Sequence, residues 1–332
     1  MRVGVMGAGS WGTTIANLLC HNGHQVRIWA LEPEVVASIN ADHENRLFLA
    51  GVALDPSLRA VTTLAEAGRD ADILVQAAPS HAVRVVTTEV MQALGLSRPI
   101  VVSLSKGLEP TTHERVSQIL GETMPGCPVV ILSGPSFATE VAEQHPTAVV
   151  AASTDAAAAR AVQGAFSNAY FRVYSATDVL GVELGGALKN VIAIAAGIAD
   201  GLGLGHNPRA ALITRGLAEL ARLGQALGAD PMTFAGLTGM GDLVLTCTGH
   251  LSRNRSLGVA LGQGRSLDDI LGERRTVAEG VKTARTALEL ADELGVEMPI
   301  TREVERILFE GKSPRQAIRD LMERELKAEQ WR

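Results

Sequence analysis

Short apolar runs rich in Val, Ile and Leu recur through the first half of the chain, and most of them are followed by a segment whose apolar residues have helical spacing. The runs span residues 2–7, 24–30, 71–78, 99–105, 128–134, 147–153 and 170–176. Near-continuous apolar strands that alternate with helices are typical of a mainly parallel sheet covered by helices on both faces. The pattern predicts the α/β fold class, with a doubly wound sheet in this half.

The second half has a different pattern. After Asp178 the β-branched runs fade, and long Ala, Leu and Gly segments with helical periodicity follow. The strongest helix candidates span residues 181–200, 207–227, 252–262, 280–295 and 301–325. A chain of 332 residues suits two domains of ordinary size. We therefore expect a sheet domain, residues 1–177, and an all-helical domain, residues 178–332, that share a cleft.

Composition excludes several classes of function. The formal net charge of −6 and the pI near 5.8 provide no basic surface for phosphates, so nucleic acid is not expected as a partner. The most apolar segment, residues 181–200, is interrupted by three charged residues, and no membrane span is expected. Cysteines without a CxxC pattern indicate reduced thiols in a cytoplasm, and His and Cys residues show no metal-ligand spacing, so no metal is expected.

The first apolar run leads into a glycine motif, GAGSWG, in which Gly7, Gly9 and Gly12 have the G-x-G-x-x-G spacing. The first glycine allows a tight turn, the second lets the backbone approach a pyrophosphate, and the third lets the next helix pack closely. An ordinary strand-turn-helix connection can show the same spacing. The place of the motif, between a strand and a helix and ahead of a second strand, favours a dinucleotide-binding domain over residues 1–177.

The end of the second strand run bears on the choice of coenzyme. Glu32 stands where an acid reads the ribose of NAD or an arginine reads the 2′-phosphate of NADP. Its carboxylate could accept from a 2′-hydroxyl and would repel a 2′-phosphate, which favours NAD. Alternatively, Glu32 is a solvated residue at a helix start ahead of Pro33. The residues alone leave both interpretations open.

Three later strand runs end in groups that could face the same ligand, because ligands bind beyond the carboxyl ends of parallel strands. Lys106 follows one run, Gly134 and Ser136 follow another, and Pro79 and Ser80 follow a third. Alternatively, the two serines only cap helices and Lys106 is a surface lysine. A lysine beside a glycine at a strand end is well placed to meet an anionic substrate.

The apolar segment 181–197, GVELGGALKNVIAIAAG, holds a cation in its middle. In a helix, Lys189 shares its face with Gly185 and Gly186, which leave room for another molecule. Desolvation would lower the pKa of such a lysine, so that it could exchange a proton near neutral pH. Alternatively, Lys189 extends to solvent from a half-buried helix.

Two further stretches carry polar side chains that suit a substrate site. Asp242 and Thr246 are four apart and share one face if their segment is helical, although Asp242 could simply be a helix N-cap. Residues 252–255, Ser-Arg-Asn-Arg, place together donors suited to a phosphate. A solvated, positively charged loop is the alternative for this second stretch.

Together the motifs closely resemble those of bacterial NAD(P)-dependent glycerol-3-phosphate dehydrogenases. They are, in order, GAGSWG, SKGLE, SGPSFATE, GVELGGALKNVIAIAAG, ITRGLAE, GMGDLVLTCT, SRNRSLG and VAEG, and the match extends from Gly7 to residue 301. Ketopantoate reductases and 6-phosphogluconate dehydrogenases share the two-domain plan and an active lysine but lack this series. The resemblance implies a cytoplasmic homodimeric oxidoreductase that uses NAD(P)H to reduce dihydroxyacetone phosphate reversibly to sn-glycerol 3-phosphate for glycerophospholipid synthesis.

The resemblance also assigns roles to matching residues. Lys189 would be the general acid in ketone reduction and the base in alcohol oxidation. Residues that would hold the substrate are Lys106, Gly134, Ser136, Asn190, Asp242, Thr246, Ser252, Arg253 and Asn254. Residues that would line the cofactor, besides the three glycines and Glu32, are Ser10, Trp11, Lys106, Ala138, Arg253, Val277 and Glu279.

One departure from the family pattern concerns the coenzyme. Many members carry His or Arg after the second strand, whereas this chain has Leu31 and Glu32. The sequence therefore does not decide whether this chain shares the usual preference of the family for NADPH. Two rival functions are the alternatives: a dehydrogenase of the same two-domain class that acts on a branched hydroxy acid, and a scaffold that senses NAD(P) without chemistry.

Overall fold

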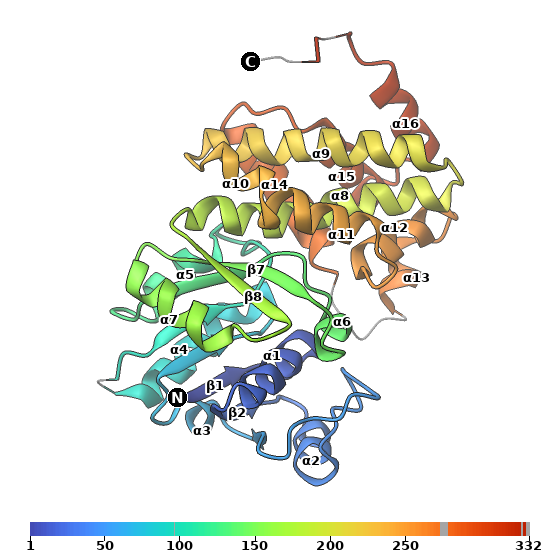
Figure 1. Ribbon diagram of the computed structural model, residues 1–332. Helices are drawn as coiled ribbons and strands as arrows, with labels where there is room; N and C mark the ends of the chain where they lie inside the picture. Colours follow the sequence, from blue (N-terminus) through green and yellow to red (C-terminus); the bar gives the residue numbers. More distant parts are fainter. Residues whose placement is uncertain (96, 273–277, 327, 330–332) are drawn as a thin grey trace.

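The computed structural model describes residues 1–95, 97–272, 278–326 and 328–329. The chain forms a sheet-containing part, blue to green in Figure 1, on which an all-helical part, yellow to red, is stacked. The last sheet strand ends at Ala176 and the first long helix of the second part begins at Val179. The α/β fold class with a helical C-terminal part is therefore confirmed.

The N-terminal part is built on one eight-stranded sheet with strand order β3-β2-β1-β4-β5-β6-β7-β8. Adjacent strands pair in parallel except β6 and β7, which are antiparallel. The chain crosses from one side of β1 to the other, so β1 and β4 flank the switch point at which ligands bind in such sheets. The strands are β1 (Arg2–Met6), β2 (Gln25–Trp29), β3 (Arg59–Val61), β4 (Ile73–Gln76), β5 (Ile100–Ser103), β6 (Val129–Ser133), β7 (Thr147–Ala152) and β8 (Phe171–Ala176).

Helices cover both faces of this sheet, because alternate strand residues point to opposite sides. Val3 and Val5 of β1 belong to a core with α1 and α7, whereas Met6 belongs to a second core with α4 and α5. The helices of this part are α1 (Ser10–His21), α2 (Pro33–Asp42), α3 (Leu64–Gly68), η1 (Ser80–Ala82), α4 (Val83–Leu94), α5 (Val116–Thr123), α6 (Ala138–Ala142) and α7 (Ala156–Phe166).

The helical part is organised around α8 (Val179–Gly201), which is buried along nearly its whole length. This helix is long and apolar enough to cross a membrane, but 89% of its most apolar stretch is buried inside the protein. It is the central core helix of this part, and in Figure 1 it lies between the sheet-containing part and α9. The others are α9 (His206–Ala226), α10 (Pro231–Ala235), η2 (Leu237–Gly241), α11 (Asp242–Thr248), α12 (Arg253–Gly262), α13 (Leu267–Gly272), α14 (Glu279–Glu293), α15 (Pro299–Phe309) and α16 (Pro314–Met322).

One helix candidate was wrong as a single element. Residues 301–325 form the greater part of α15 and all of α16, with a break at residues 310–313. Gly311 has a φ of 70° there, and Ser313 caps α16 by accepting from the Gln316 N–H. The apolar periodicity continues across the break, but a left-handed glycine followed by Pro314 cannot continue a helix.

α8 and α12 cross with their backbones almost in contact. A Cβ added to Gly197 of α8 would lie 2.1 Å from the carbonyl oxygen of Arg255, and one added to Gly258 of α12 would lie 2.1 Å from that of Ile194. No real Cβ approaches an oxygen so closely, so any side chain at these positions must push the helices apart. Only glycine permits this crossing.

Gly258→Ala is therefore expected to destabilise the protein by about 1–3 kcal/mol, the usual cost of overpacking a core. Gly164→Ala in α7 is the matched control, because a Cβ at Gly164 meets nothing within 4 Å. That change should instead stabilise by up to about 1 kcal/mol through helix propensity. Urea denaturation followed by circular dichroism compares the two, and equal stabilities would contradict the proposed backbone contact.

Candidate active site

The glycine motif forms the turn between β1 and α1. Gly7 has a φ of 122°, and a Cβ on Gly12 would lie 2.0 Å from the Gly7 carbonyl oxygen. At Gly9 an added Cβ would meet nothing within 4 Å, so this backbone faces open space. The motif therefore has the tight turn, the open backbone and the close helix packing that a pyrophosphate site needs.

The start of α1 offers backbone donors to an anion. The first helical hydrogen bond runs from the Thr13 N–H to the Gly9 carbonyl, so the N–H groups of residues 10–12 precede it. The N-cap Gly9 has no side chain to bond these groups, and the first turn contains no acidic residue. The residues present thus fit a dinucleotide pyrophosphate, both by open donors and by the positive end of the helix dipole.

Three other residues expected to line the cofactor lie around this helix. The Ser10 hydroxyl donates to the Phe48 carbonyl (2.5 Å), so its backbone rather than its hydroxyl is available to a ligand. The Trp11 ring packs against Phe171, with ring centroids 6.4 Å apart. Ala138 begins α6, and its carbonyl accepts from Thr14 of α1 (3.2 Å).

Glu32 follows β2 directly and occupies the N-cap position of α2. Its backbone carbonyl accepts from the Val35 and Val36 N–H groups, but its carboxylate makes no cap hydrogen bond. The position agrees with both interpretations of this residue, while the carboxylate is left for another partner.

The helical part brings a buried charge cluster to the carboxyl ends of the strands. Lys189 of α8 donates to Asp242 and, at 2.8 Å, to the Thr246 hydroxyl. The Lys106 Nζ, on the loop after β5, donates to the other Asp242 oxygen at 2.7 Å. Lys189 is 6% exposed and Asp242 1%. One carboxylate thus lies between two ammonium groups that are 83 residues apart in the sequence, from Lys106 to Lys189.

Burial controls the ionisation of this cluster. Desolvation is the largest effect on Lys189 and, with the nearby Lys106 charge, lowers its pKa to about 7, while Asp242 acts in the opposite direction. For Asp242, burial alone would raise the pKa, but the two lysines hold it below its usual value. Asp242 therefore stays ionised while Lys189 can exchange a proton near neutral pH. The structure thus shows Lys189 buried within the apolar segment and not extending to solvent.

Asn190, next to Lys189, belongs to a second set of buried polar contacts. Its amide donates to the Lys106 carbonyl (3.3 Å), and its oxygen accepts from the Asn254 amide (2.9 Å). The Asn254 oxygen in turn accepts from the Gly280 N–H (3.0 Å) at the start of α14. These contacts tie the loop after β5 to α8, α12 and α14.

The Ser-Arg-Asn-Arg stretch begins helix α12 and is not a loop. Ser252 caps the helix by accepting from the Arg255 N–H (3.2 Å), and Arg253, at its first position, is exposed. Arg255 donates to Asp200 (2.8 Å), to which Arg209 also donates (2.9 Å). Arg255 is therefore held in an ion pair with Asp200.

The residues that follow β4, β5 and β6 agree only in part with the contacts expected from the sequence. The Lys106 Nζ donates to the Gly134 carbonyl (2.9 Å), which brings these two residues together as expected. The alternative that Ser80 and Ser136 cap helices is wrong: Ser136 donates to the Gly134 carbonyl (3.0 Å), and Ser80 donates to Glu279 (2.6 Å). The N-cap positions of η1 and α6 are Pro79 and Phe137, and no side chain caps either helix.

Glu279, the first residue of α14, crosses from the helical part to the end of β4. Besides accepting from the Ser80 hydroxyl, it accepts from the Ser80 N–H (3.2 Å). Its pairing with Ser80 was not predicted, because 199 residues separate the two and neither stretch shows a pattern that points to the other. Val277, the other cofactor residue expected here, lies outside the described residues.

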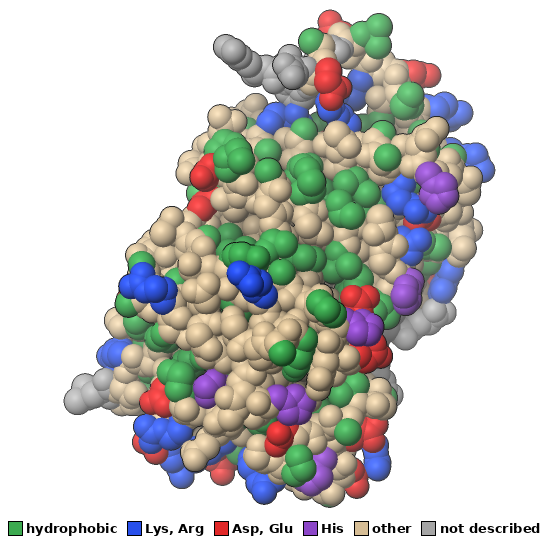
Figure 2. Space-filling model, in the orientation of Figure 1, with side chains coloured by type: hydrophobic (Ala, Val, Ile, Leu, Met, Phe, Trp, Pro, Cys, Tyr) green, Lys and Arg blue, Asp and Glu red, His purple; other side chains and the backbone are tan. Residues whose placement is uncertain are grey.

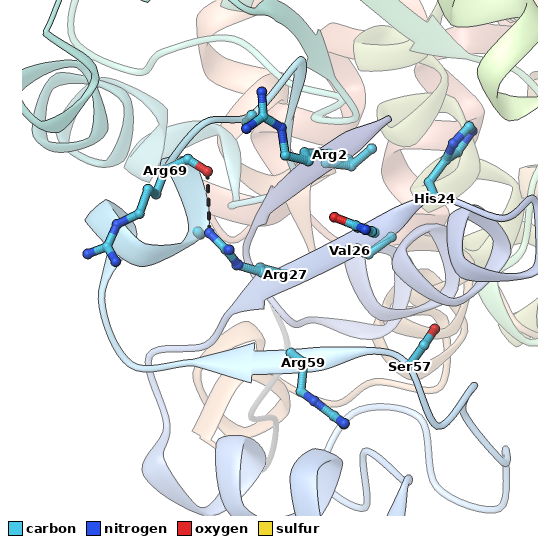
Figure 3. Close-up of a pocket in the computed structure, with 11 residues that line it drawn as sticks. Arg2, His24, Val26, Arg27, Ser57, Arg59 and Arg69 are labelled. Atoms are coloured by element: carbon cyan, nitrogen blue, oxygen red, sulfur yellow. Dashed lines mark hydrogen bonds between the residues drawn. The ribbon is translucent and has the colours of Figure 1, made fainter.

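A separate hollow of about 250 Å³ lies at the opposite edge of the sheet, at the amino ends of β1 and β2 (Figure 3). Arg2, Arg27, Arg59 and Arg69 line it, but their guanidinium groups point in different directions. Arg27 donates to the Glu66 and Arg69 carbonyls (3.2 and 3.3 Å). This hollow is distant from the strand ends that carry the charge cluster, so it is not part of the candidate site.

Family models match both halves of the chain. The model of the NAD-dependent glycerol-3-phosphate dehydrogenase N-terminus matches residues 2–159, and that of the C-terminus matches residues 178–319. A glycerol-3-phosphate dehydrogenase (NAD(P)+) of Geobacter metallireducens is 57% identical, covering 99% of this chain and 98% of its own. One of Geobacillus kaustophilus is 51% identical, covering 99% and 96%.

The solved structures that resemble this chain include members of the same family. The crystal structure of glycerol-3-phosphate dehydrogenase from Coxiella burnetii superposes with a TM-score of 0.93 at 37% identity, covering 97% of this chain and 99% of its own. A ketopantoate reductase from Ralstonia eutropha superposes with a TM-score of 0.63 at 18% identity, covering 96% and 100%, which shows a shared fold alone.

Proposed function

We propose the reaction of this protein from a plain premise: the chain belongs to the NAD-dependent glycerol-3-phosphate dehydrogenase family. It is an NAD(P)-dependent oxidoreductase that interconverts dihydroxyacetone phosphate and sn-glycerol 3-phosphate. The observation that carries the mechanism is the buried cluster of Lys189, Asp242 and Lys106 at the carboxyl ends of the strands. In this proposal residues 1–177 bind the dinucleotide and residues 178–332 supply the catalytic lysine.

Lys189 is the general acid for ketone reduction. When bound, NAD(P)H supplies the hydride for the carbonyl carbon. The ammonium of Lys189 stabilises the negative charge that develops on the carbonyl oxygen and then transfers a proton to it. In alcohol oxidation the neutral amine takes that proton back. Asp242 and the Thr246 hydroxyl, both bonded to the Lys189 Nζ, hold the group in one orientation.

The charges of the site suit an anionic substrate. Two ammonium groups face one carboxylate, so the cluster carries a net positive charge whenever Lys189 is protonated. Lys106 therefore attracts the substrate, and Asn190 fixes the loop that carries Lys106. Arg253 and Asn254, at the first turn of α12, are the proposed phosphate ligands. Gly134 and Ser136 follow β6, and Ser252 is the N-cap of α12.

The coenzyme is proposed to lie along the carboxyl ends of β1, β2 and β4. Gly7, Gly9, Gly12 and the residue 10–12 N–H groups would bind its pyrophosphate, and Glu32 would accept from the ribose. A carboxylate there repels a 2′-phosphate, so we expect NADH to be preferred over NADPH. The proposed setting is a cytoplasmic step of glycerophospholipid synthesis.

A homodimer is also proposed, as the family resemblance implies. Figure 2 shows hydrophobic side chains gathered across the middle of one face, where the helical part meets the sheet part. The exposed large hydrophobic residues include Met232, Met240 and Val244, from α10, η2 and α11. Such a concentration is typical of an interface. Light scattering during gel filtration tests the assembly, and a monomer at micromolar concentration would contradict it.

The pH dependence of the reaction follows from the pKa of Lys189, which burial lowers to about 7. Reduction needs the ammonium, so its kcat should hold below pH 7 and fall about tenfold per unit well above it. Oxidation needs the neutral amine, so its kcat should rise through the same pH. Initial rates in both directions across neutral pH test this, and a reduction rate that stays constant far above pH 7 would contradict the assignment.

Absorbance at 340 nm with dihydroxyacetone phosphate and either NADH or NADPH tests the function directly. We expect oxidation of the reduced coenzyme, faster with NADH, and little with ketopantoate or another branched keto acid. Turnover of the branched keto acid alone would favour the hydroxy-acid dehydrogenase alternative. Tight binding of NADH without oxidation by any keto phosphate would favour a nucleotide-sensing scaffold.

A further inference from the structure

The segment between α2 and β3, residues 43–58, packs along α1 and the glycine motif. Three side chains attach it there. Asn17 accepts from the Asp55 N–H (2.7 Å), Ser10 donates to the Phe48 carbonyl (2.5 Å), and Asn45 reaches the glycine motif itself. Asn45 has no solvent exposure. Asparagine side chains are mostly exposed, and a buried one needs hydrogen-bond partners inside the protein.

Every polar atom of the Asn45 side chain has a partner. Its amide donates to the Ala8 carbonyl and to the Thr13 hydroxyl, both at 2.8 Å. Its oxygen accepts from the Phe48 N–H (3.1 Å). Thr13 also donates to the Ala8 carbonyl (3.1 Å). Two donors from different segments therefore hold one carbonyl, that of the residue between Gly7 and Gly9.

Holding this carbonyl fixes the direction of the next N–H group. The peptide bond is planar, and the carbonyl and the N–H of a trans peptide point in opposite directions. Because Asn45 and Thr13 draw the Ala8 carbonyl into the protein, the Gly9 N–H must point the other way, and the backbone of Gly9 faces open space. Glycines do not fix this orientation, since they tolerate many backbone conformations.

We infer that Asn45, assisted by Thr13, is a positioning residue for the coenzyme: it fixes the Ala8–Gly9 peptide so that the Gly9 N–H is presented to the pyrophosphate. Asn45 touches neither the coenzyme nor the substrate in this role. The inference rests on the proposed function, because it needs a dinucleotide at the glycine motif.

The test measures NADH binding by fluorescence titration and steady-state kinetics for wild type, Asn45→Ala, Thr13→Val and the control Asn17→Ala. Asn17 is a buried asparagine that attaches the same segment to α1 without touching the glycine motif. Asn45→Ala should raise the NADH Kd about tenfold and Thr13→Val about threefold, the usual effect of lost hydrogen bonds. For both variants, kcat at saturating NADH and the KM for dihydroxyacetone phosphate should change less than about twofold.

Unchanged NADH binding by a folded Asn45→Ala variant would overturn the inference, and so would an equal loss in Asn17→Ala, because the segment would then act only as structure. If Asn45→Ala does not fold by circular dichroism, Thr13→Val decides between the same outcomes. Wild type that binds neither NADH nor NADPH would overturn the proposed function itself and the inference with it, so the two failures are distinguishable.

Discussion

Lys189→Ala is expected to lower kcat for dihydroxyacetone phosphate reduction by about 10³-fold or more, while the Kd for NADH stays within about twofold of wild type. The ammonium is the only proposed proton donor to the carbonyl oxygen, and it also stabilises the charge that forms there. Its contacts are to Asp242 and Thr246, away from the glycine motif, so coenzyme binding should not depend on it. Stopped-flow reduction and NADH titration measure the two quantities.

The control for this prediction is Lys282→Ala, which removes an exposed lysine from α14. It should leave kcat unchanged. A Lys189→Ala protein that is folded and turns over at the wild-type rate would show that another group donates the proton. Loss of NADH binding together with turnover would instead show that Lys189 supports the structure of the cleft.

Most of the fold could be predicted because the central strands β1, β4, β5 and β6 are buried on both faces. Such strands leave near-continuous apolar runs, and seven of the eight strands were recognised from them. β3 was missed because it has only three residues at the sheet edge and begins with the exposed Arg59. The antiparallel direction of β7 could not be inferred, because an apolar run has the same appearance in either direction.

The site could be predicted less completely than the fold. Lys189 was recognisable because a cation is rare within so apolar a segment, and Asp242 and Thr246 because they are four apart. Lys106 and Asp242 are 136 residues apart in the sequence. Periodicity predicts neighbours within one helix or strand, so it could not predict this contact. The role of Asn45 could not be predicted, because a buried amide that bonds to one backbone carbonyl requires no particular residues beside it in the sequence.

The Ser-Arg-Asn-Arg stretch shows why similar residues can differ in role. Arg253 and Arg255 are two apart, so they point to different sides of α12. Arg255 meets Asp200 inside the helical part, whereas Arg253 is exposed at the helix start. Composition alone made both of them candidates for the phosphate, whereas the structure shows that they lie in different surroundings.

Asp242→Asn is expected to lower kcat for reduction about 100-fold at neutral pH and to move the falling limb of its pH profile to lower pH. Asp242 raises the pKa of Lys189 against the desolvation that lowers it. An amide of the same size keeps the shape of the site but removes that attraction, so the pKa of Lys189 falls below about 7 and less ammonium remains. Two ammonium groups would also be left without a counter-charge, which is costly in a buried site.

The matched control is Asp200→Asn, which removes another buried carboxylate of the helical part from Arg209 and Arg255. Both variants should lose stability, because breaking a buried ion pair costs about 3–5 kcal/mol. Only Asp242→Asn should shift the pH profile, since Asp200 bonds to Arg209 and Arg255 and makes no bond to Lys189. A shift of equal size in both variants would assign the effect to loosened packing, whereas partial recovery of Asp242→Asn reduction at lower pH would identify the carboxylate as the group that keeps Lys189 protonated.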